Sequence, residues 1–296
     1  MSDYVCRCGI VILNYNSHDL TKILAEKVAD YSAVTTVCVV DNHSKDDFDG
    51  DFTNPKIHYI KNTRNSGYSA GNNIGLRYLI EEEKCDYVFI ANPDVIFDES
   101  AITEMRDKMA EDPLLALIST KRYGHNKSTI HQYFDFPTLT DSIRSCFYFT
   151  RRKLMKERFS KQNIAVDNTK GILNVDAVPG AFFGIRSEFL KKNNYIYEGI
   201  FLYGEEIILG RQAALLGYKA GVINTATYIH DHKQTRFSNR KMFWYDRKSL
   251  KRYYEMFEDF NKLQWGILNL AIVLGTIEYN IEFFIYKLIK TVTSVH

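Results

Sequence analysis

The sequence predicts an α/β fold in which a mostly parallel, Rossmann-like central sheet is flanked by helices and followed by a C-terminal helical extension. Three observations carry this prediction. Short apolar runs such as residues 8–14 and 34–42 are typical of strands that are buried on both faces. Helix-like segments alternate with these runs, which indicates parallel strands joined by helical crossovers. Residues 236–296 are almost entirely helical in pattern.

The elements follow in a regular order along the first part of the chain. We expect strands at residues 8–14, 34–42, 56–61, 86–94 and 114–120. We expect helices from about residue 16 to 31, from the glycine-rich stretch to about 83, and over 99–111. Residues 121–174 give no clear period. The segment 175–186, a helix near 187–193, the segment 201–218 and a strand-like run at 219–230 come after it.

Composition narrows the class of protein. The 296 residues suit one large domain with an appendage, and 45% hydrophobic content supports a sizeable core. A net charge of only +2 argues against a polyanion binder, so we expect no nucleic-acid partner. Five cysteines without a CxxC pair indicate reduced thiols in a cytoplasmic protein. The first apolar run lacks a preceding basic region and a cleavage site, so we interpret it as a strand rather than a signal peptide.

Polar residues collect where the predicted strands end. The first strand ends in Asn14, Tyr15 and Asn16, the second ends in the segment Asp41-Asn42-His43-Ser44, and the fourth ends in the segment 92–94. Open parallel sheets bind ligands at the carboxyl ends of their strands. Each residue alone is equally typical of a turn or a helix cap, but three strands delivering Asn and Asp to one edge favour a binding site.

The glycine-rich stretch NSGYSAGNNIG, residues 65–75, opens a helix with residues that weaken helices. A helix N-terminus attracts phosphate, and glycine allows a ligand to approach the backbone closely. Glycines at 67, 71 and 75 would equally form a smooth face that packs on a sheet or helix. The two interpretations are compatible, and no GxGxxG dinucleotide motif follows the first strand.

Seven motifs occur in one order across roughly residues 8–235. They are VILNYNS (11–17), VVDNHSKDD (39–47), NSGYSAGNNIGL (65–76), FIANPDV (89–95), VPGAFFGIR (178–186), FLYGEEIILGRQAALLGY (201–218) and YIHDHKQT (228–235). The ordered set resembles family 2 glycosyltransferases with the GT-A fold, in their rhamnosyltransferase-like bacterial branch. The resemblance implies a catalytic domain over 1–235, with a nucleotide-sugar half at about 1–120 and an acceptor half at about 121–235. Residues 236–296 would form the extension.

The resemblance also implies how a nucleotide-diphosphate sugar, dTDP- or UDP-linked, is bound. Asp41 and the turn from Asn14 through Tyr15 to Asn16 would hold the base and ribose, and a carboxylate suits a pyrimidine imide N–H. Asn65 and the turn from Gly67 through Gly71 to Asn72 would lie beside the nucleotide and the donor sugar. Rhamnose is the sugar that the branch favours, and UDP-hexoses and galactofuranose remain alternatives.

A metal motif is implied at residues 92–94, where the family usually has Asp-x-Asp. Here the first position is Asn92, so Asp94 is the remaining carboxylate ligand and Asn92 offers a neutral contact. His230 or His232 fills the family's histidine position, and alignment favours His230. Such ligands suit Mn²⁺ or Mg²⁺, which would neutralise the departing diphosphate.

The catalytic base is implied at the start of a helix, where the family has a Glu-Asp pair and this chain has Glu205 and Glu206. Direct inversion needs one carboxylate to accept the proton of the acceptor hydroxyl. Glu206 takes that position, and Glu205 is the fallback base or an acceptor-binding residue. Acidic residues at a helix start are also favoured by the helix dipole alone.

The C-terminal extension joins basic, aromatic and apolar segments. Residues 236–262 contain eight Lys or Arg against four Asp or Glu, and residues 263–277 contain no charge. Fifteen residues fall short of the roughly 20 that a spanning helix needs. We expect an interfacial helix pair at the inner face of the cell membrane, next to a lipid-linked acceptor. A helical hairpin packed on the catalytic domain or on a second subunit of a homodimer is the alternative.

The sequence therefore predicts an inverting glycosyltransferase of bacterial surface polysaccharide synthesis, such as capsule or cell wall, that acts on a saccharide or lipid-linked saccharide. Two other classes remain open. A nucleotidyltransferase shares a nucleotide-binding α/β half, but it typically has a glycine-rich basic loop after the first strand, where this chain has NYNSHDL. A binding protein that has lost catalysis would account for the Asn at 92 and the Glu at 206.

Overall fold

The structure is a computed structural model that describes residues 6–45, 49–231 and 240–293. The chain forms two compact units, which are described separately. Unit 1 comprises residues 1–136 and 162–233, and unit 2 comprises residues 137–161 and 234–296. This grouping differs from the predicted division at one point, because residues 137–161 pack with the C-terminal helices rather than with the rest of the expected acceptor half.

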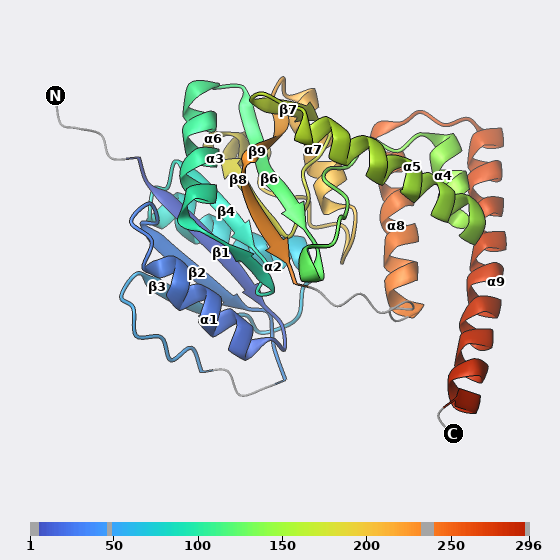
Figure 1. Cartoon of the computed structure of the whole chain (residues 1–296), viewed down its shortest axis with the longest axis horizontal. Coiled ribbons are helices and arrows are strands. Elements are labelled where there is room, and N and C mark those ends of the chain that lie inside the picture. Colours follow the sequence, from blue (N-terminus) through green and yellow to red (C-terminus); the bar gives the residue numbers. More distant parts are fainter. Residues whose placement is uncertain (1–5, 46–48, 232–239, 294–296) are drawn as a thin grey trace. The chain divides into compact units, whose positions relative to one another are not determined.

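Unit 1 is built on a nine-stranded sheet, counted over the described residues (Figure 1). Its strands are β1 (Cys8–Asn14), β2 (Thr36–Asp41), β3 (Ile57–Lys61), β4 (Tyr87–Ala91), β5 (Val95–Phe97), β6 (Leu115–Tyr123), β7 (Ile172–Val175), β8 (Phe182–Arg186) and β9 (Lys219–His230). The order is β3-β2-β1-β4-β8-β6-β9-β5, and β7 also pairs with β9. The sheet is parallel from β3 to β4, as expected, and becomes mixed where β8 runs antiparallel between β4 and β6.

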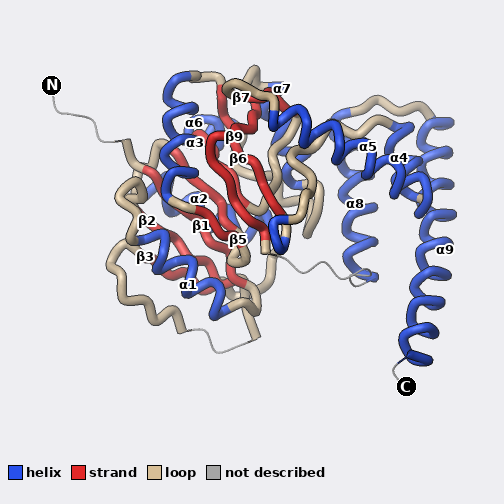
Figure 2. The backbone as a smooth tube through the Cα atoms, viewed as in Figure 1, coloured by secondary structure: helices blue, strands red, loops and turns tan. Residues whose placement is uncertain are grey.

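Helices cover both faces of this sheet (Figure 2). They are α1 (His18–Ala29), α2 (Tyr68–Arg77) with its π-helical continuation η1 (Tyr78–Glu82), α3 (Glu99–Glu111), α6 (Ser187–Lys192), α7 (Glu205–Leu215) and the short 3-10 turn η2 (His125–Lys127). Ile10 and Ile12 face a core that contains α1 and α3, whereas Val11 between them faces a core that contains α2, α6 and α7. The alternation of side chains along β1 therefore produces three layers, with a core on each side of the sheet.

The glycines of α2 fit closely against the sheet. A Cβ at Gly75 would lie 2.8 Å from Cγ1 of Val11, and a Cβ at Gly71 would lie 2.7 Å from Cδ1 of Leu13. Both distances are shorter than a carbon–carbon contact. Packing of α2 on β1 therefore explains these two glycines.

Unit 2 is helical in its described part. It contains α4 (Leu139–Cys146), most of α5 (Tyr148–Asp167), α8 (Arg240–Phe257) and α9 (Lys262–Thr293). The Tyr254 hydroxyl of α8 lies 2.6 Å from the Ser142 hydroxyl of α4, and the Phe243 ring stacks on Tyr279 of α9 at 4.4 Å. A Cβ at Gly275 would meet the backbone of Cys146, so α9 passes directly against the end of α4.

The apolar helix α9 is longer than the sequence analysis allowed. Its segment Lys262–Lys287 has 26 residues and a mean hydropathy of 1.4, which makes it long and apolar enough to cross a membrane by length and composition. The uncharged run of residues 263–277 alone is too short for this, but the apolar helix continues through Glu278 and Glu282 to Lys287. The expected interfacial placement of the helix stays a prediction. One face of α9 nevertheless packs against α4.

Replacing Gly75 with alanine should lower the free energy of unfolding by about 1–3 kcal/mol, because the added methyl group overlaps Val11 and Val40. Urea denaturation followed by circular dichroism measures the change. Gly171→Ala is the matched control, since no atom lies within 4 Å of its added Cβ. Equal stability of the two variants would contradict the packing explanation.

Candidate active site

The ends of β1 and β2 are joined by a buried polar cluster. Asn14 Nδ2 donates to Asp41 Oδ1 at 2.9 Å, and the Ser44 hydroxyl donates to the same carboxylate oxygen at 2.5 Å. Asn14 Oδ1 in turn accepts from the hydroxyl of Thr21 at 2.8 Å. Asp41 is only 1% exposed, so these contacts fix the carboxylate at the edge of the sheet.

The two residues after Asn14 lie at the surface of the same edge. Asn16 has a φ of +55° and its side-chain oxygen accepts from the Lys45 amide at 2.8 Å, which ties the turn after β1 to the loop after β2. Left-handed backbone is more accessible to asparagine than to most residues. Tyr15, which follows the last residue of β1, is 43% exposed.

Asn42 connects this cluster to the glycine-rich turn. The sequence analysis placed it among the polar residues at a strand end but assigned it no role. Its Nδ2 donates to Asn65 Oδ1 and to the Gly67 carbonyl, both at 3.1 Å. Its Oδ1 accepts from Asn62 Nδ2 at 3.1 Å, and its backbone amide donates to the Asn14 carbonyl at 2.8 Å. An amide side chain can donate and accept at once, so one buried residue links three loops.

The N-terminus of α2 is held by its own protein contacts. The Gly67 amide donates to Asn65 Oδ1 at 3.0 Å and the Tyr68 amide donates to the Phe201 carbonyl at 3.0 Å. Gly67 has a φ of +92° and a Cβ there would lie 2.5 Å from the Phe201 oxygen, so glycine is required. Gly71 and Asn72 are buried, and Asn72 Nδ2 donates to the Tyr68 carbonyl at 3.0 Å. These two residues support the turn from inside.

The segment 180–181 joins α2, β4 and α7. The Gly180 amide donates to Glu206 Oε1 at 3.1 Å, and its carbonyl accepts from the Tyr68 hydroxyl at 2.5 Å. The next residue, Ala181, accepts from the Asn92 amide at 2.8 Å. Glu206 is therefore connected through two consecutive peptide units to the end of β4 and to the start of α2.

Burial shapes the electrostatics around Glu206. Desolvation raises the pKa of its carboxyl above the ordinary glutamate value, and the backbone N–H bonds and the Arg122 charge oppose this effect. Burial and the nearby glutamates also raise the pKa of the Tyr68 hydroxyl, so Tyr68 stays a hydrogen-bond donor. Glu205 is more buried than Glu206, at 5% exposure. Of the two predicted acids, Glu206 is the one whose carboxylate accepts the hydrogen bond from the Gly180 amide.

Asp94 and His230 come together through a short strand that the sequence analysis missed. β5 pairs antiparallel with the end of β9, so that Val95 faces His230, and the Asp231 amide donates to the Asp94 carbonyl at 2.8 Å. As a result His230 Nε2 lies 3.2 Å from Asp94 Oδ1. Beside them the Asp231 carboxylate lies 2.5 Å from His125 Nδ1.

A carboxylate oxygen and an imidazole nitrogen at this separation fit two positions of a divalent cation whose other ligands are water and phosphate oxygens. Among the residues that the structure describes, no group of three or more His, Cys, Asp or Glu could hold a metal ion by itself. Asn92 lies at the adjacent end of β4. The alternative histidine, His232, lies outside the described residues.

The predicted residues thus form one continuous region at the carboxyl edge of unit 1. It runs from Asn14 and Asp41 through Asn65 and Gly67 to Glu206, and from there through residues 180–181 to the end of β4. A sequence profile for "Glycosyl transferase family 2" matches residues 9–192, a range that includes most of this region.

The chain belongs to glycosyl transferase family 2. Two curated relatives agree with this assignment. The chain is 26% identical over 240 residues to the low-salt glycan biosynthesis hexosyltransferase Agl10 of Haloferax volcanii, which covers 80% of this chain and 72% of the relative. It is 27% identical over 194 residues to the rhamnosyltransferase WbbL of Escherichia coli K12, which covers 63% of this chain and 69% of the relative.

Solved structures confirm the GT-A fold of this family member. GalNAc-T7, solved with UDP, GalNAc and Mn²⁺, matches with a TM-score of 0.59 and 12% identity over 86% of this chain and 48% of its own. The mannosyltransferase PcManGT of Pyrobaculum calidifontis, solved with GDP-Man and Mn²⁺, matches with a TM-score of 0.57 and 13% identity over 99% of this chain and 81% of its own. At these identities the likeness concerns the fold alone.

Replacing Asn42 with alanine should lower the free energy of unfolding by about 1–3 kcal/mol, because the buried partners of its amide lose a donor and an acceptor together. Thermal and urea unfolding measure the effect. Asn54→Ala is the control, since Asn54 Nδ2 donates to Asp30 at an exposed position. A smaller loss at Asn42 than at Asn54 would contradict the role of Asn42 as the connection between the three loops.

Proposed function

We propose that this glycosyltransferase is an inverting hexosyltransferase. It moves a sugar, with rhamnose favoured, from a dTDP- or UDP-linked donor to a hydroxyl of a saccharide or lipid-linked saccharide during bacterial surface polysaccharide synthesis in the cytoplasm. The observation that supports it best is the link from Glu206 through Gly180 and Ala181 to the backbone of Asn92. This link keeps a carboxylate of raised pKa near the end of β4, where the motif of residues 92–94 lies.

In the proposed reaction Glu206 accepts the proton of the acceptor hydroxyl. The acceptor oxygen forms a bond to the anomeric carbon while the bond from that carbon to the diphosphate oxygen breaks, and the electron pair leaves with the diphosphate. Attack from the face opposite the leaving group inverts the configuration, as in inverting hydrolases with a sugar hydroxyl in place of water. A raised pKa makes Glu206 a better proton acceptor than an exposed glutamate.

The donor binds along the ends of β1 and β2 in this proposal. Asp41 accepts from the imide N–H of a pyrimidine, and Asn14 and Asn16 keep the carboxylate and its loop in place. The exposed ring of Tyr15 stacks on the base. Asn65 and Gly67 lie beside the nucleotide and the donor sugar, whereas Gly71 and Asn72 act from within the fold.

Asp94 and His230 would hold Mn²⁺ or Mg²⁺ in this proposal, with Asn92 as a neutral contact. The cation supplies positive charge that neutralises the departing diphosphate. The chemistry of the donor set supports this assignment, because an acid and an imidazole lie 3.2 Å apart at the strand end that carries the family's metal motif.

The sugar and the acceptor are the least constrained parts of the proposal. The printed names of the two relatives, a rhamnosyltransferase and a hexosyltransferase, support a hexose or deoxyhexose donor. Membership of glycosyl transferase family 2 favours a glycosyltransferase over a nucleotidyltransferase. Incubation with a saccharide acceptor, Mn²⁺ and dTDP-rhamnose, UDP-glucose, UDP-galactose or UDP-galactofuranose, followed by measurement of nucleotide diphosphate release, identifies the donor. No release with any donor, together with tight donor binding, would favour the inactive binding protein.

Glu206→Gln should reduce transfer by about 10²–10⁴-fold, because the amide cannot accept the proton. Initial rates of nucleotide diphosphate release measure the loss, and circular dichroism checks the fold. Glu205→Gln is the matched control and should keep most of the activity.

In the wild-type enzyme the activity should fall toward acid pH as Glu206 becomes protonated, with a midpoint above the roughly 4.3 of an exposed glutamate.

The reverse pattern, in which Glu205→Gln loses activity and Glu206→Gln keeps it, would transfer the role of base to Glu205. An acid limb at or below the ordinary glutamate pKa would argue against a buried base.

Asp94→Ala should raise the Mn²⁺ concentration needed for half-maximal donor binding by about tenfold or more, because the carboxylate ligand is lost. Isothermal titration of the donor at several Mn²⁺ concentrations, and after chelation with EDTA, measures this shift. His230→Ala should act in the same direction. His125→Ala is a nearby control that leaves both proposed ligands in place. A Mn²⁺ requirement that is unchanged in Asp94→Ala would refute the metal assignment.

A further inference from the structure

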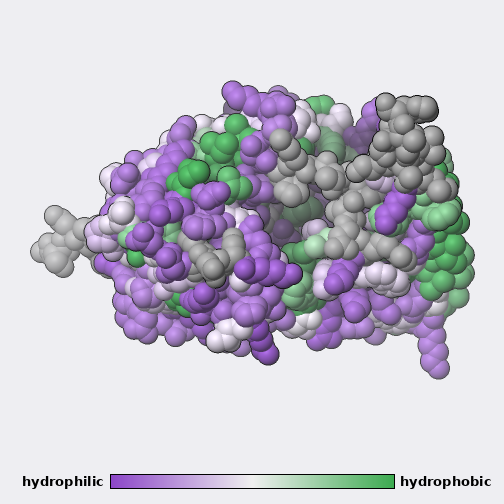
Figure 3. Space-filling model, turned by 90° about the horizontal axis from the view of Figure 1, so that it is seen from below, coloured by the Kyte–Doolittle hydropathy of each residue, from purple (hydrophilic) through white to green (hydrophobic). Residues whose placement is uncertain are grey.

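The outward face of α9 is apolar and exposed within unit 2. Between Leu263 and Ile285 nine large apolar side chains are exposed, each by 42% or more of its surface. At 100° per residue these side chains occupy an arc of about 120°, and Gly266 is the other described residue in it. Figure 3 shows hydrophobic side chains gathered along this edge of unit 2. Exposed apolar patches of this extent mark contact surfaces.

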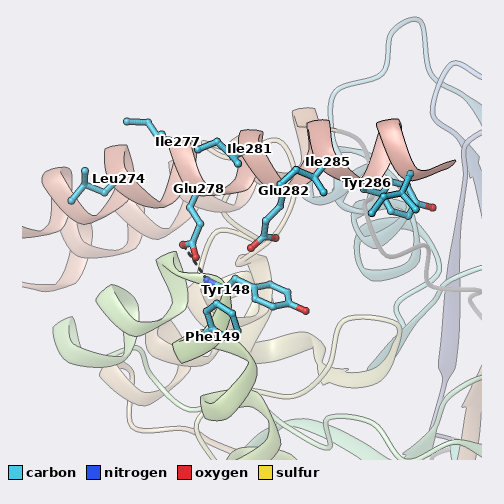
Figure 4. Close-up of a pocket in the computed structure, with 10 residues that line it drawn as sticks. Tyr148, Phe149, Leu274, Ile277, Glu278, Ile281, Glu282, Ile285 and Tyr286 are labelled. Carbon is cyan, nitrogen blue, oxygen red and sulfur yellow. Dashed lines mark hydrogen bonds between the residues drawn. The ribbon is translucent and has the colours of Figure 1, made fainter. Parts of the chain in front are cut away.

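The charged residues of α9 point elsewhere. Glu278 and Glu282 point toward Tyr148 at the start of α5, whereas Ile277 points away from it (Figure 4). Glu278 Oε2 accepts from the Tyr148 amide at 3.2 Å. Together with Phe149, which is 79% exposed, these residues line an apolar groove of about 550 Å³ that is continuous with the outward face. Within the described residues, the arc of about 120° that forms the outward face therefore contains no carboxylate, and Glu278 and Glu282 lie beside it, on the side of the groove that faces α5.

Unit 2 is strongly basic. Its sequence has 17 Lys and Arg against 8 Asp and Glu, a formal net charge of +9, whereas unit 1 has 21 against 28, a net charge of −7. Lys153, Lys156 and Lys248 are exposed and make no ion pair within the part of the chain that the structure describes. Basic residues near an apolar helix face attract anionic lipid headgroups.

We propose that unit 2 docks on an anionic lipid bilayer, with the outward face of α9 and Phe149 inserted among the acyl chains and the basic residues of α5 and α8 near the headgroups. Because the other face of α9 packs on α4, the helix lies in the interface rather than crossing the membrane. A second copy on the same face would bring two units of charge +9 within a Debye length of about 8 Å, which opposes dimerisation. This docking goes beyond the transfer reaction, and its value for reaching a lipid-linked acceptor rests on the proposed function.

Co-sedimentation of the full chain with vesicles tests the docking. The wild type should bind vesicles of phosphatidylcholine mixed with phosphatidylglycerol and bind pure phosphatidylcholine vesicles more weakly. The double variant Ile277→Ser, Ile281→Ser should partition at least about tenfold less, because two inserted side chains are lost. Ile23→Ser with Leu114→Ser, two exposed apolar positions of unit 1, is the matched control and should bind as the wild type does.

A second variant distinguishes a loss of electrostatic attraction to the vesicles from a general folding defect. Lys153→Glu with Lys156→Glu should lower binding to the phosphatidylglycerol vesicles by about tenfold or more, and it should leave the weaker phosphatidylcholine binding unchanged. Light scattering without lipid measures the oligomeric state. The proposal would be overturned if the wild type is a dimer, the Ile277→Ser, Ile281→Ser variant is a monomer and neither binds vesicles. The face would then bind a second copy of the chain.

Donor turnover on a soluble saccharide distinguishes the two proposals. The α9 variant should keep wild-type turnover, since its substitutions lie in unit 2. Absence of wild-type binding to anionic vesicles overturns the docking even if turnover is normal. Vesicle binding without turnover on any donor supports the docking. This result contradicts only the proposed transferase activity.

Discussion

The arrangement of the candidate active site depends on two consecutive peptide units, those of Gly180 and Ala181. The Gly180 amide holds Glu206, its carbonyl holds the Tyr68 hydroxyl, and the Ala181 carbonyl holds the Asn92 amide. A Cβ at Gly180 would overlap the Glu206 carboxyl group, so any larger residue would displace this carboxylate. Helix α7, helix α2 and strand β4 therefore share one anchoring point, and the antiparallel strand β8 that follows it directly fixes its place in the sheet.

The asparagine-rich edge of the sheet follows from the need to join several loops without burying charge. Asn14 and Asn42 both donate and accept inside the fold, and one buried carboxylate, Asp41, accepts hydrogen bonds from Asn14 and Ser44. Amides suit this task because burying a hydrogen-bonded amide avoids the desolvation cost of burying a charged group. The glycines of α2 serve a different purpose, since they let the helix lie close enough to β1 for these amides to meet.

Much of unit 1 could be predicted from the sequence. The bounds of α3 and β1 agree with the expected ranges, because β1 is a short apolar run that stops at a polar residue and α3 has clear ends. β5 was missed because three residues are too few for a pattern, although it is the strand that brings Asp94 to His230. α5 gave no period because its two ends pack in different units, with Leu154 buried in unit 2 and Val166 in unit 1. Asn42 was recognised only as a polar residue at a strand end, because its role depends on partners from three separate loops, which no local motif records.

The separation of charge between the units has a consequence for handling the protein. The isoelectric point of about 8.1 calculated for the whole chain describes neither unit, since a +9 segment and a −7 segment nearly cancel in it. Ion-exchange resins respond to the charge on the surface that touches them. The protein should therefore be retained on cation exchangers through unit 2 even near its isoelectric point, and buffers of low ionic strength should promote association between opposite units of neighbouring molecules.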